Sequence, residues 1–278
     1  MKIYLSILSL GALAASQSHG VLLAYEPFDD AAGTQVPTGW SGTGRSDTTV
    51  TSGSLTAVSG LADSQGNKFS VLDEGGTNTY GLPFTPTGNS TGATIYYSFL
   101  FELTDISALP TDVANGPLFT LSDTTSKKAA AFSVALDADN ANAFNIGLDG
   151  SNKGIGSAST MVDTTEYLPN TTLFIVVSYK PNGGGAGVAN LWVNPDSSTF
   201  GTDTPPTVTL SDTGGYLADA QYLLFDKEYS ATQPLNVDEI RVGTSWADVT
   251  PTSVPEPGHY AMMLGAATLG LLWLRRRR

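Results

Sequence analysis

Carboxylates dominate the reactive side chains between residues 21 and 253. Both histidines, His19 and His259, lie outside this segment, and the chain contains no cysteine. A Ser-His-Asp triad, a cysteine nucleophile, disulfides, and zinc, copper or haem sites of the usual His/Cys type are therefore excluded there. The chemistry that remains uses carboxylate, hydroxyl and amide oxygens.

Asp137, Asp139 and Asn140 bring oxygen side chains close together along the chain. Alternating acids can direct oxygen ligands to one calcium ion. The EF-hand pattern is not met, because Ala141 occupies a ligand position. Asp and Asn in a tight turn commonly accept hydrogen bonds from the backbone. We therefore favour a turn and keep a calcium site as the alternative.

Aromatic side chains offer a second kind of chemistry, the stacking of a ring on the apolar face of a sugar. In sandwich folds most aromatic side chains fill the core between the two sheets instead, and we expect this of Tyr97 and Trp192. Trp40 lies in a loop rich in glycine and serine, at residues 37–42. Trp40 is therefore the aromatic residue that we predict to be exposed and able to bind a ligand.

The charge of residues 21–253 restricts the partners of the chain. This segment holds 25 acidic and 8 basic residues, which gives a net charge of about −17 at neutral pH. Such a body repels nucleic acid and anionic lipid headgroups, so we expect no nucleic-acid partner. It attracts divalent cations.

Short β-branched and aromatic runs separated by turn residues predict an all-β protein. Alternation is clearest at residues 94–102, where Ile95, Tyr97, Phe99 and Phe101 share one face. Residues 172–180 and 188–193 form a predicted hairpin around a glycine-rich loop. Residues 130–136 and 143–148 form a second strand pair. Further strands are predicted at residues 22–28, 68–72, 118–121, 221–225 and 237–242.

These elements indicate one domain over residues 21–249, an antiparallel β-sandwich. No convincing amphipathic helix lies among the predicted strands, so alternating βαβ units are disfavoured. About 230 residues are enough for one large core. Residues 201–215 are interpreted as a polar connection within the domain.

The first 20 residues have the pattern of a secretory signal peptide. Lys2 supplies a positive charge, residues 3–15 are mainly apolar, and small residues follow. Two cleavage positions fit the sequence, one after Gly20 and one near Ala24.

The end of the chain combines an acidic proline motif, an apolar run and a basic cluster. Residues 250–257 form a predicted tether, and the apolar run at 258–274 is shorter than the roughly 20 residues that usually cross a bilayer. Terminal arginines can extend that length and favour a cytoplasmic C-terminus, so we predict a transmembrane helix. The motif is Val254, Pro255, Glu256 and Pro257, and the cluster is Arg275, Arg276, Arg277 and Arg278.

This tripartite tail resembles the PEP-CTERM sorting signal of Gram-negative bacteria. The resemblance covers about 25 residues and implies recognition by an exosortase, with cleavage near the Pro-Glu-Pro motif. It also implies export, first as a precursor held in the inner membrane and then in the cell envelope or outside the cell.

A second, looser resemblance covers most of residues 21–248. The runs at 174–180, 191–195 and 237–246 resemble laminin-G-like and concanavalin A-like jelly rolls. The resemblance implies that the strand near the C-terminus pairs with the first strand, at residues 23–28. The superfamily includes lectins, glucanases and non-catalytic adhesion modules, so a polysaccharide is the implied ligand.

The glucanase branch of that superfamily carries a Glu-x-Asp-x-Glu or Glu-x-Asp-x-x-Glu string on one strand. None of the glutamates between residues 21 and 253 begins such a string. We therefore favour a non-catalytic envelope or matrix protein that binds carbohydrate. The alternative is a secreted glycoside hydrolase or polysaccharide lyase that uses carboxylates and tyrosine, with its acids brought together from distant strands.

Overall fold

The computed structural model describes residues 20–72, 79–85, 92–107, 109, 118–123, 127–151, 161–226 and 234–252. Residues 1–19 of the expected signal peptide lie outside these ranges. The same is true of the Val254–Pro257 motif, the apolar run at 258–274 and the four terminal arginines. Within the described ranges, no helix has both the length and the apolar character needed to cross a bilayer.

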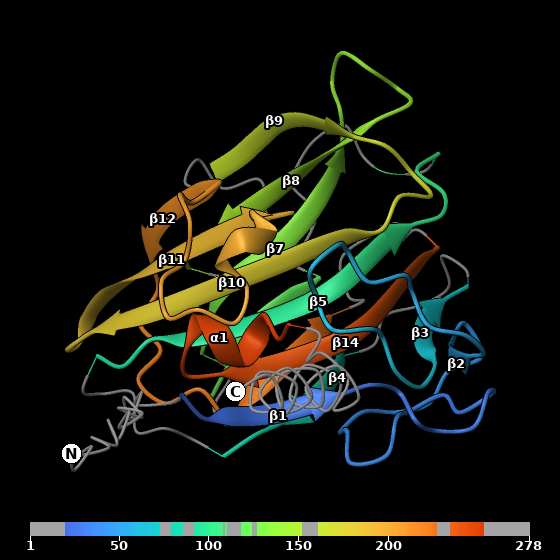
Figure 1. Ribbon diagram of the computed structural model, residues 1–278, viewed down its shortest axis with the longest axis horizontal. Helices are drawn as coiled ribbons and strands as arrows, with labels where there is room; N and C mark the ends of the chain where they lie inside the picture. The colour runs from blue at the N-terminus through green and yellow to red at the C-terminus, as the bar shows by residue number, and fades with distance from the viewer. Residues whose placement is uncertain are drawn as a thin grey trace, which may run out of the picture.

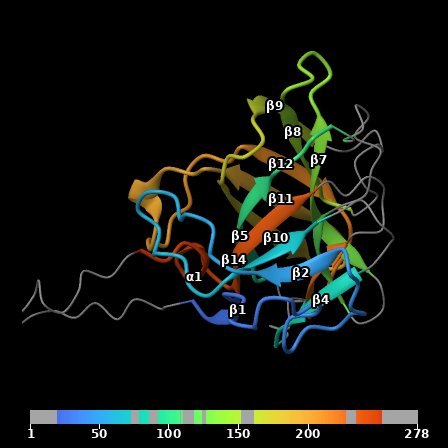
Figure 2. The same ribbon diagram turned by 90° about the vertical axis from the view of Figure 1, so that its right-hand side faces the viewer.

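The described residues form two antiparallel sheets packed face to face (Figure 1 and Figure 2). Sheet A has the order β12-β11-β10-β5-β14-β3-β2, with β1 also paired to β14. Its strands are β1 (Leu22–Glu26), β2 (Thr48–Thr51), β3 (Lys68–Val71), β5 (Ile95–Leu103), β10 (Leu173–Asn182), β11 (Gly185–Val193), β12 (Leu210–Gly214) and β14 (Leu235–Gly243).

Sheet B has the order β4-β13-β6-β7-β8-β9. Two short helices accompany the sheets, η2 (Ser197–Thr199) and α1 (Trp246–Val249). The strands of sheet B are β4 (Thr79–Pro83), β6 (Phe119–Ser122), β7 (Lys128–Leu136), β8 (Phe144–Asp149), β9 (Met161–Tyr167) and β13 (Tyr222–Asp226). The predicted antiparallel sandwich is confirmed.

The route of the chain between the sheets is that of a jelly roll. In sheet A, β14 lies between β3 and β5, and in sheet B, β13 lies between β4 and β6. The segments β3–β4 and β5–β6 therefore cross from sheet A to sheet B on either side of the returning segment β13–β14. In this topology the first strand, β1, pairs with the last strand, β14, which lies inside sheet A.

Strand β14 changes partner along one of its sides. Its first residues pair with β3, and its last residues pair with β1, in the register Leu22 to Gly243 and Glu26 to Ile240. Glu239 lies at the change, with a positive φ of 51°, inside a bulge of the pairing with β5. The expected pairing of the closing strand with the first strand is confirmed.

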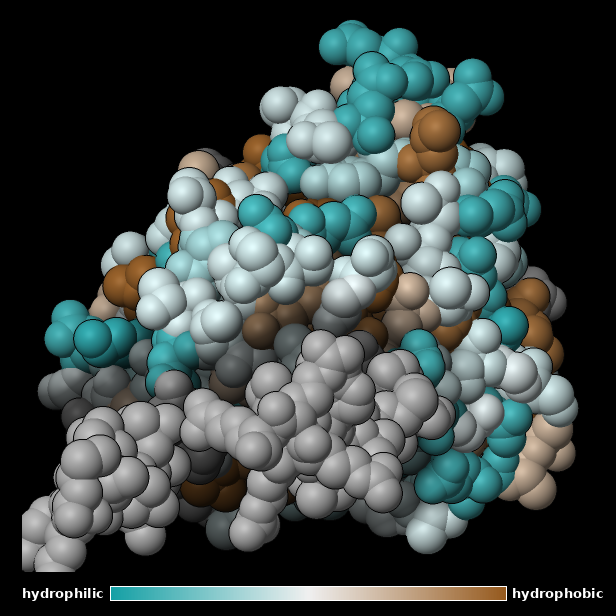
Figure 3. Space-filling view, viewed as in Figure 1, coloured by the Kyte–Doolittle hydropathy of each residue, from teal (hydrophilic) through white to brown (hydrophobic). Residues whose placement is uncertain are grey.

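The main core lies between the sheets, and alternation along β5 builds it. Tyr97, Phe99 and Phe101 are fully buried in this core, whereas Leu100 points to the other face of sheet A. The face of the molecule seen in Figure 3 is mostly hydrophilic or neutral outside the grey region, and its hydrophobic residues are scattered. Across the described residues, most large apolar side chains are buried.

A second apolar cluster covers the outer face of sheet A. It contains Trp192 and Trp246, whose rings lie 5.1 Å apart, together with Leu55, Phe174 and Phe200. Trp192 is buried as expected, but the prediction that it lies between the sheets is wrong. Its neighbour Leu191 faces the main core, so alternation turns Trp192 outward beneath the loops that carry η2 and α1.

Candidate functional site

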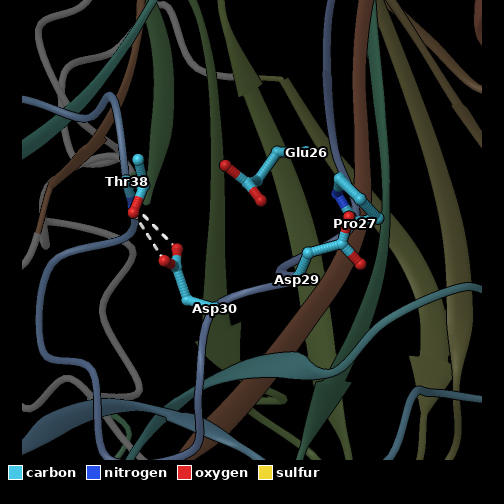
Figure 4. A pocket seen from close by; sticks show the side chains of 5 residues that line it. All are labelled: Glu26, Pro27, Asp29, Asp30 and Thr38. Atoms are coloured by element: carbon cyan, nitrogen blue, oxygen red, sulfur yellow. Dashed lines mark hydrogen bonds between the residues drawn. The ribbon is translucent and has the colours of Figure 1, made fainter.

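A cleft of about 340 Å³ opens where strand β1 ends. Its lining residues are Glu26, Pro27, Asp29, Asp30 and Thr38. Glu26 is the last residue of β1 and pairs with Ile240 of β14, so the sheet fixes its position. The chain then leaves the sheet, and this turn brings three acids to one place (Figure 4).

Glu26 is the most enclosed of the three acids, with 8% of its surface exposed. Its Oε1 accepts a hydrogen bond from the backbone N–H of Phe28 at 2.7 Å, and its Oε2 accepts one from Nε1 of Trp40 at 2.8 Å. Burial raises the pKa of the Glu26 carboxyl, and the two N–H donors oppose this rise. The donors hold the carboxylate in one orientation.

Asp30 is oriented by Thr38. Oδ2 of Asp30 accepts a hydrogen bond from the backbone N–H of Thr38 at 2.7 Å, and Oδ1 accepts one from its hydroxyl. Asn67 donates its side-chain amide to the backbone carbonyl of Asp30 at 3.0 Å, which ties this loop to the residues before β3. Asp29 is exposed, and no described residue donates a hydrogen bond to its side chain.

Gly66 lies directly against Pro27 and Asp29, two residues that line the cleft. Its φ is +65°, and a Cβ atom at this position would lie 2.2 Å from the carbonyl oxygen of Pro27 and 2.8 Å from Oδ1 of Asp29. The next residue, Asn67, donates its backbone N–H to the same Pro27 carbonyl at 3.2 Å. A glycine is therefore required for this close approach of the two loops.

The cleft offers hydrogen-bond acceptors and no positive charge. Its five lining residues include three carboxylates and no basic side chain, and the Thr38 hydroxyl already donates to Asp30. The arrangement suits a ligand rich in O–H or N–H donors, and it disfavours an anionic ligand. Figure 4 shows the carboxylates apart from one another, and no group of three acids in the described ranges is placed to hold a metal ion.

Trp40 lies beneath this cleft and not on its surface. It is 9% exposed and packs against Phe28 and Phe69, with ring centroids 6.0 and 6.4 Å away. The predicted exposure of Trp40 is therefore wrong. The glycine-rich loop folds back onto the core, because Nε1 of Trp40 finds a buried partner in Glu26.

The residues Asp137, Asp139 and Asn140 form a tight turn between β7 and β8. Oδ1 of Asp137 accepts the backbone N–H groups of Asp139 and Asn140 at 2.9 and 2.8 Å, and its Oδ2 accepts the amide of Asn145 at 2.9 Å. These hydrogen bonds lower the pKa of the Asp137 carboxyl. The favoured interpretation of this segment as a turn is confirmed.

Sequence reasoning did not single out Glu26, Asp29, Asp30 and Thr38. The available signal was the closeness of three acids directly after the predicted first strand, where side chains at a strand end gather in loops. The predicted sorting residues Val254 to Pro257 and Arg275 to Arg278 lie outside the described residues.

Comparison with known proteins gives similarity only at the level of solved structures. No protein-family model and no curated protein matches the chain. An endo-β-1,4-glucuronan lyase from the fungus Trichoderma reesei is 12% identical, with 84% of this chain and 100% of that chain covered and a TM-score of 0.49. A carbohydrate esterase from Shiga toxin-encoding bacteriophage phi24B is also 12% identical, with 82% and 100% covered and a TM-score of 0.49.

The carbohydrate recognition domain of Emp46p, in its metal-free form, is a third similar structure. It is 10% identical to this chain, with 78% of this chain and 94% of that chain covered and a TM-score of 0.41. At this level of identity no residue role passes from these proteins to the present chain.

Proposed function

We propose that the chain is an exported, non-catalytic protein that binds a neutral, hydroxyl-rich carbohydrate in the cleft between Glu26 and Thr38. The observation that carries this proposal is that three carboxyl side chains and no basic side chain line the cleft. Sugar hydroxyl groups donate hydrogen bonds to carboxylates. The Asp29 carboxylate, which accepts no hydrogen bond from the described part of the chain, is the acceptor that is open to them. A uronate polymer would meet repulsion from all three acids.

The hydrogen bonds within the cleft support a binding role over catalysis. All four side-chain oxygens of Glu26 and Asp30 already accept N–H or O–H donors. A retaining glycosidase instead needs one carboxyl group that carries a proton toward the leaving group and a second that attacks the sugar. Carboxyl groups whose oxygens are already oriented by donors suit recognition of hydroxyl groups.

The cleft lies at the end of β1 opposite to Gly20, the residue that precedes the domain. Gly20 lies beside Ser245 and Asp248 of the α1 region at one end of β1, and Glu26 lies at the other end. In this proposal the tail is processed near Glu256 by an exosortase-type enzyme, after the apolar run has held the precursor in the inner membrane. The mature protein then belongs to the cell envelope or the extracellular matrix.

Titration calorimetry with neutral and uronate oligosaccharides tests the binding proposal. We expect binding of a neutral glycan, and Asp29→Asn should weaken it roughly tenfold, because a charged acceptor is lost. The matched control is Asp203→Asn, which removes one charge from an exposed loop outside the cleft. Binding restricted to uronates, or equal losses in the two variants, would refute the proposal.

One observation favours the alternative of a carboxylate-dependent glycoside hydrolase or polysaccharide lyase. Burial raises the pKa of Glu26, as is required of a general acid. If Glu26 is that acid, the purified protein releases reducing ends or unsaturated products from a polysaccharide panel, and Glu26→Gln abolishes the release. We expect no turnover on any polysaccharide.

A further inference from the structure

Val21, at the start of the domain, is hydrogen-bonded to Thr244, near the C-terminal end of the domain. The backbone N–H of Val21 donates to the hydroxyl of Thr244 at 2.8 Å, and the Thr244 N–H donates to the Val21 carbonyl at 3.1 Å. Strand β1 continues this ladder from Leu22 to Glu26 along β14. Val21 is thus the first residue that the sheet engages.

Gly20 lies directly against the carboxylate of Asp248. A Cβ atom at Gly20 would be 2.2 Å from Oδ2 of Asp248 and 2.2 Å from the hydroxyl oxygen of Ser245. The Asp248 carboxylate also accepts the backbone N–H groups of Thr244 and Ser245, at 3.1 and 2.8 Å. An acidic group is therefore fixed beside the bond that joins residue 20 to residue 21.

Of the two cleavage positions that the sequence leaves open, only one preserves the sheet. A cut after Ala24 would remove Leu22 and Ala24, which pair with Gly243 and Val242. It would also remove the core contacts of Leu23 and Ala24. A cut after Gly20 leaves every residue of β1 in place. It also has small residues at the two positions that signal cleavage favours, Ser18 and Gly20.

We propose that signal processing hydrolyses the bond between Gly20 and Val21, and that the new α-ammonium group of Val21 binds between Thr244 and Asp248. This proposal rests on the export included in the proposed function. Water adds across the peptide bond, the signal peptide leaves with the Gly20 carboxylate, and the Val21 nitrogen is protonated at neutral pH. The cut is made before folding, and the body then folds around the new terminus.

The charges around this terminus favour the ion pair. Asp248 is the acid beside the position that Gly20 vacates, and Thr244 and Ser245 contribute hydroxyl groups. Arg241 is the nearest cation of β14 in register, but it lies over the ring of Tyr25 at 3.8 Å and pairs with Glu239. The ammonium group retains the hydrogen bond to Thr244 and gains further donors for Asp248.

The first test is the N-terminal sequence of the full chain recovered from the exported fraction of a Gram-negative host. We expect Val21 as the first residue. An exported protein that begins at Tyr25, or at any residue other than Val21, overturns this inference and leaves export standing. A protein that keeps Met1 and stays in the cytoplasm refutes export itself, and with it both this inference and the exported location in the proposed function. The sugar-binding test is independent of each outcome.

The second test measures unfolding by urea between pH 7 and pH 9.5. An α-amino group has an ordinary pKa of about 8, and the pair with Asp248 raises it in the folded state. Its stabilising effect is therefore present below pH 8 and lost as the pH rises through the higher folded value. The unfolding constant of the processed protein should rise by roughly two- to fivefold over this range, the scale of an exposed ion pair.

Two variants isolate this effect from other titrations. Asp248→Asn keeps a side-chain acceptor for the α1 cap but removes the charge, and Ser18→Trp blocks processing, so that residue 21 keeps an amide nitrogen. Both should lack the rise, whereas Asp203→Asn should retain it. An equal rise in either of the first two variants overturns the ion pair. If Asp248→Asn does not fold, the pH dependence of the unfolding constant can still be compared between the processed protein and Ser18→Trp. That comparison alone tests the ion pair.

Discussion

The carboxylate of Asp238 accepts a hydrogen bond from the backbone N–H of Leu55 at 2.7 Å, across 183 residues of chain. Its neighbour Glu239 accepts the backbone N–H of Gln65 at 2.6 Å. Two adjacent acids of β14 thus hold the loop between β2 and β3 at two points. The left-handed backbone at Glu239 turns the two side chains to positions from which both reach that loop.

Asp238 should make stability fall as the pH rises toward neutrality. Its side chain is fully buried, and this burial raises its pKa to about 7, against an ordinary value near 4. The folded state therefore binds a proton more tightly than the unfolded state. The stabilising effect is complete below about pH 4 and is lost as the pH rises to about 7, by an amount on the order of a few kcal/mol.

Urea unfolding of wild type and Asp238→Asn at several pH values from 4 to 8 measures this effect. The variant loses one acceptor for Leu55 or Glu239, which costs about 1–3 kcal/mol at low pH. The difference in unfolding free energy between the two proteins should shrink as the pH rises. A difference that stays constant, or grows, would show that Asp238 is ionised in the folded protein throughout.

Gly66→Ala should destabilise the protein far more than Gly53→Ala. Both glycines have a positive φ, +65° and +84°, so both variants carry backbone strain of about 1 kcal/mol. The Gly66 Cβ would also collide with the Pro27 carbonyl, whereas nothing lies within 4 Å at Gly53. We expect a loss on the order of 3 kcal/mol or more for Gly66→Ala by chemical unfolding. Similar losses in the two variants would contradict the close approach.

Trp40→Phe should reduce stability more at pH 7 than at pH 4. The variant leaves Oε2 of the buried Glu26 without its N–H donor, which costs about 1–3 kcal/mol when the carboxyl group is ionised. Loss of this donor raises the pKa of Glu26 further, so protonation at low pH relieves the cost. The matched control is Trp192→Phe, whose Nε1 donates to the neutral carbonyl of Pro206 at 3.0 Å. The loss of stability in Trp192→Phe should not depend on pH.

Variants of the turn between β7 and β8 separate a structural turn from a calcium site. Asp137→Ala removes three hydrogen bonds to one carboxylate and should lower stability more than the loss of an exposed side chain in the same turn does. Asp139→Ala removes an exposed side chain and should change stability by less than about 0.5 kcal/mol. Millimolar calcium should leave the Tm of the wild type and of both variants unchanged. A calcium-dependent rise in Tm that both variants abolish would establish the metal site instead.

The sequence was sufficient for the interior strands and for β1, and insufficient for the strands at the ends of each sheet. Every predicted strand is present, including the hairpin β10–β11 and the pair β7–β8. The four strands that sequence reasoning missed are β2, β4, β9 and β12, and each lies at an end of the strand order of its sheet. An edge strand has a partner on one side only, so it tolerates the Thr, Asp, Gly and Pro that hid these strands.

Residues 201–215 illustrate this limit. They were interpreted as a polar connection, yet their second half is β12, in which Leu210 is the buried residue. The cleft was missed for a related reason. Glu26 and Thr38 meet because Trp40 folds inward to a partner 14 residues earlier, and local polarity predicted the opposite direction for its ring. Contacts with residues distant in sequence determine both the strand β12 and the inward position of Trp40, and local composition does not reveal such contacts.

The pairing of Leu22 with Gly243 also sets the order in which this fold can be completed. The strand that a ribosome makes first has its partner in the strand made last, so sheet A stays open until residue 243 is available. Contacts of such long sequence separation carry a high entropic cost before they are rewarded, and folding should be slow. A nascent chain of this design cannot complete sheet A, and stays susceptible to proteases there, for almost the whole of its synthesis.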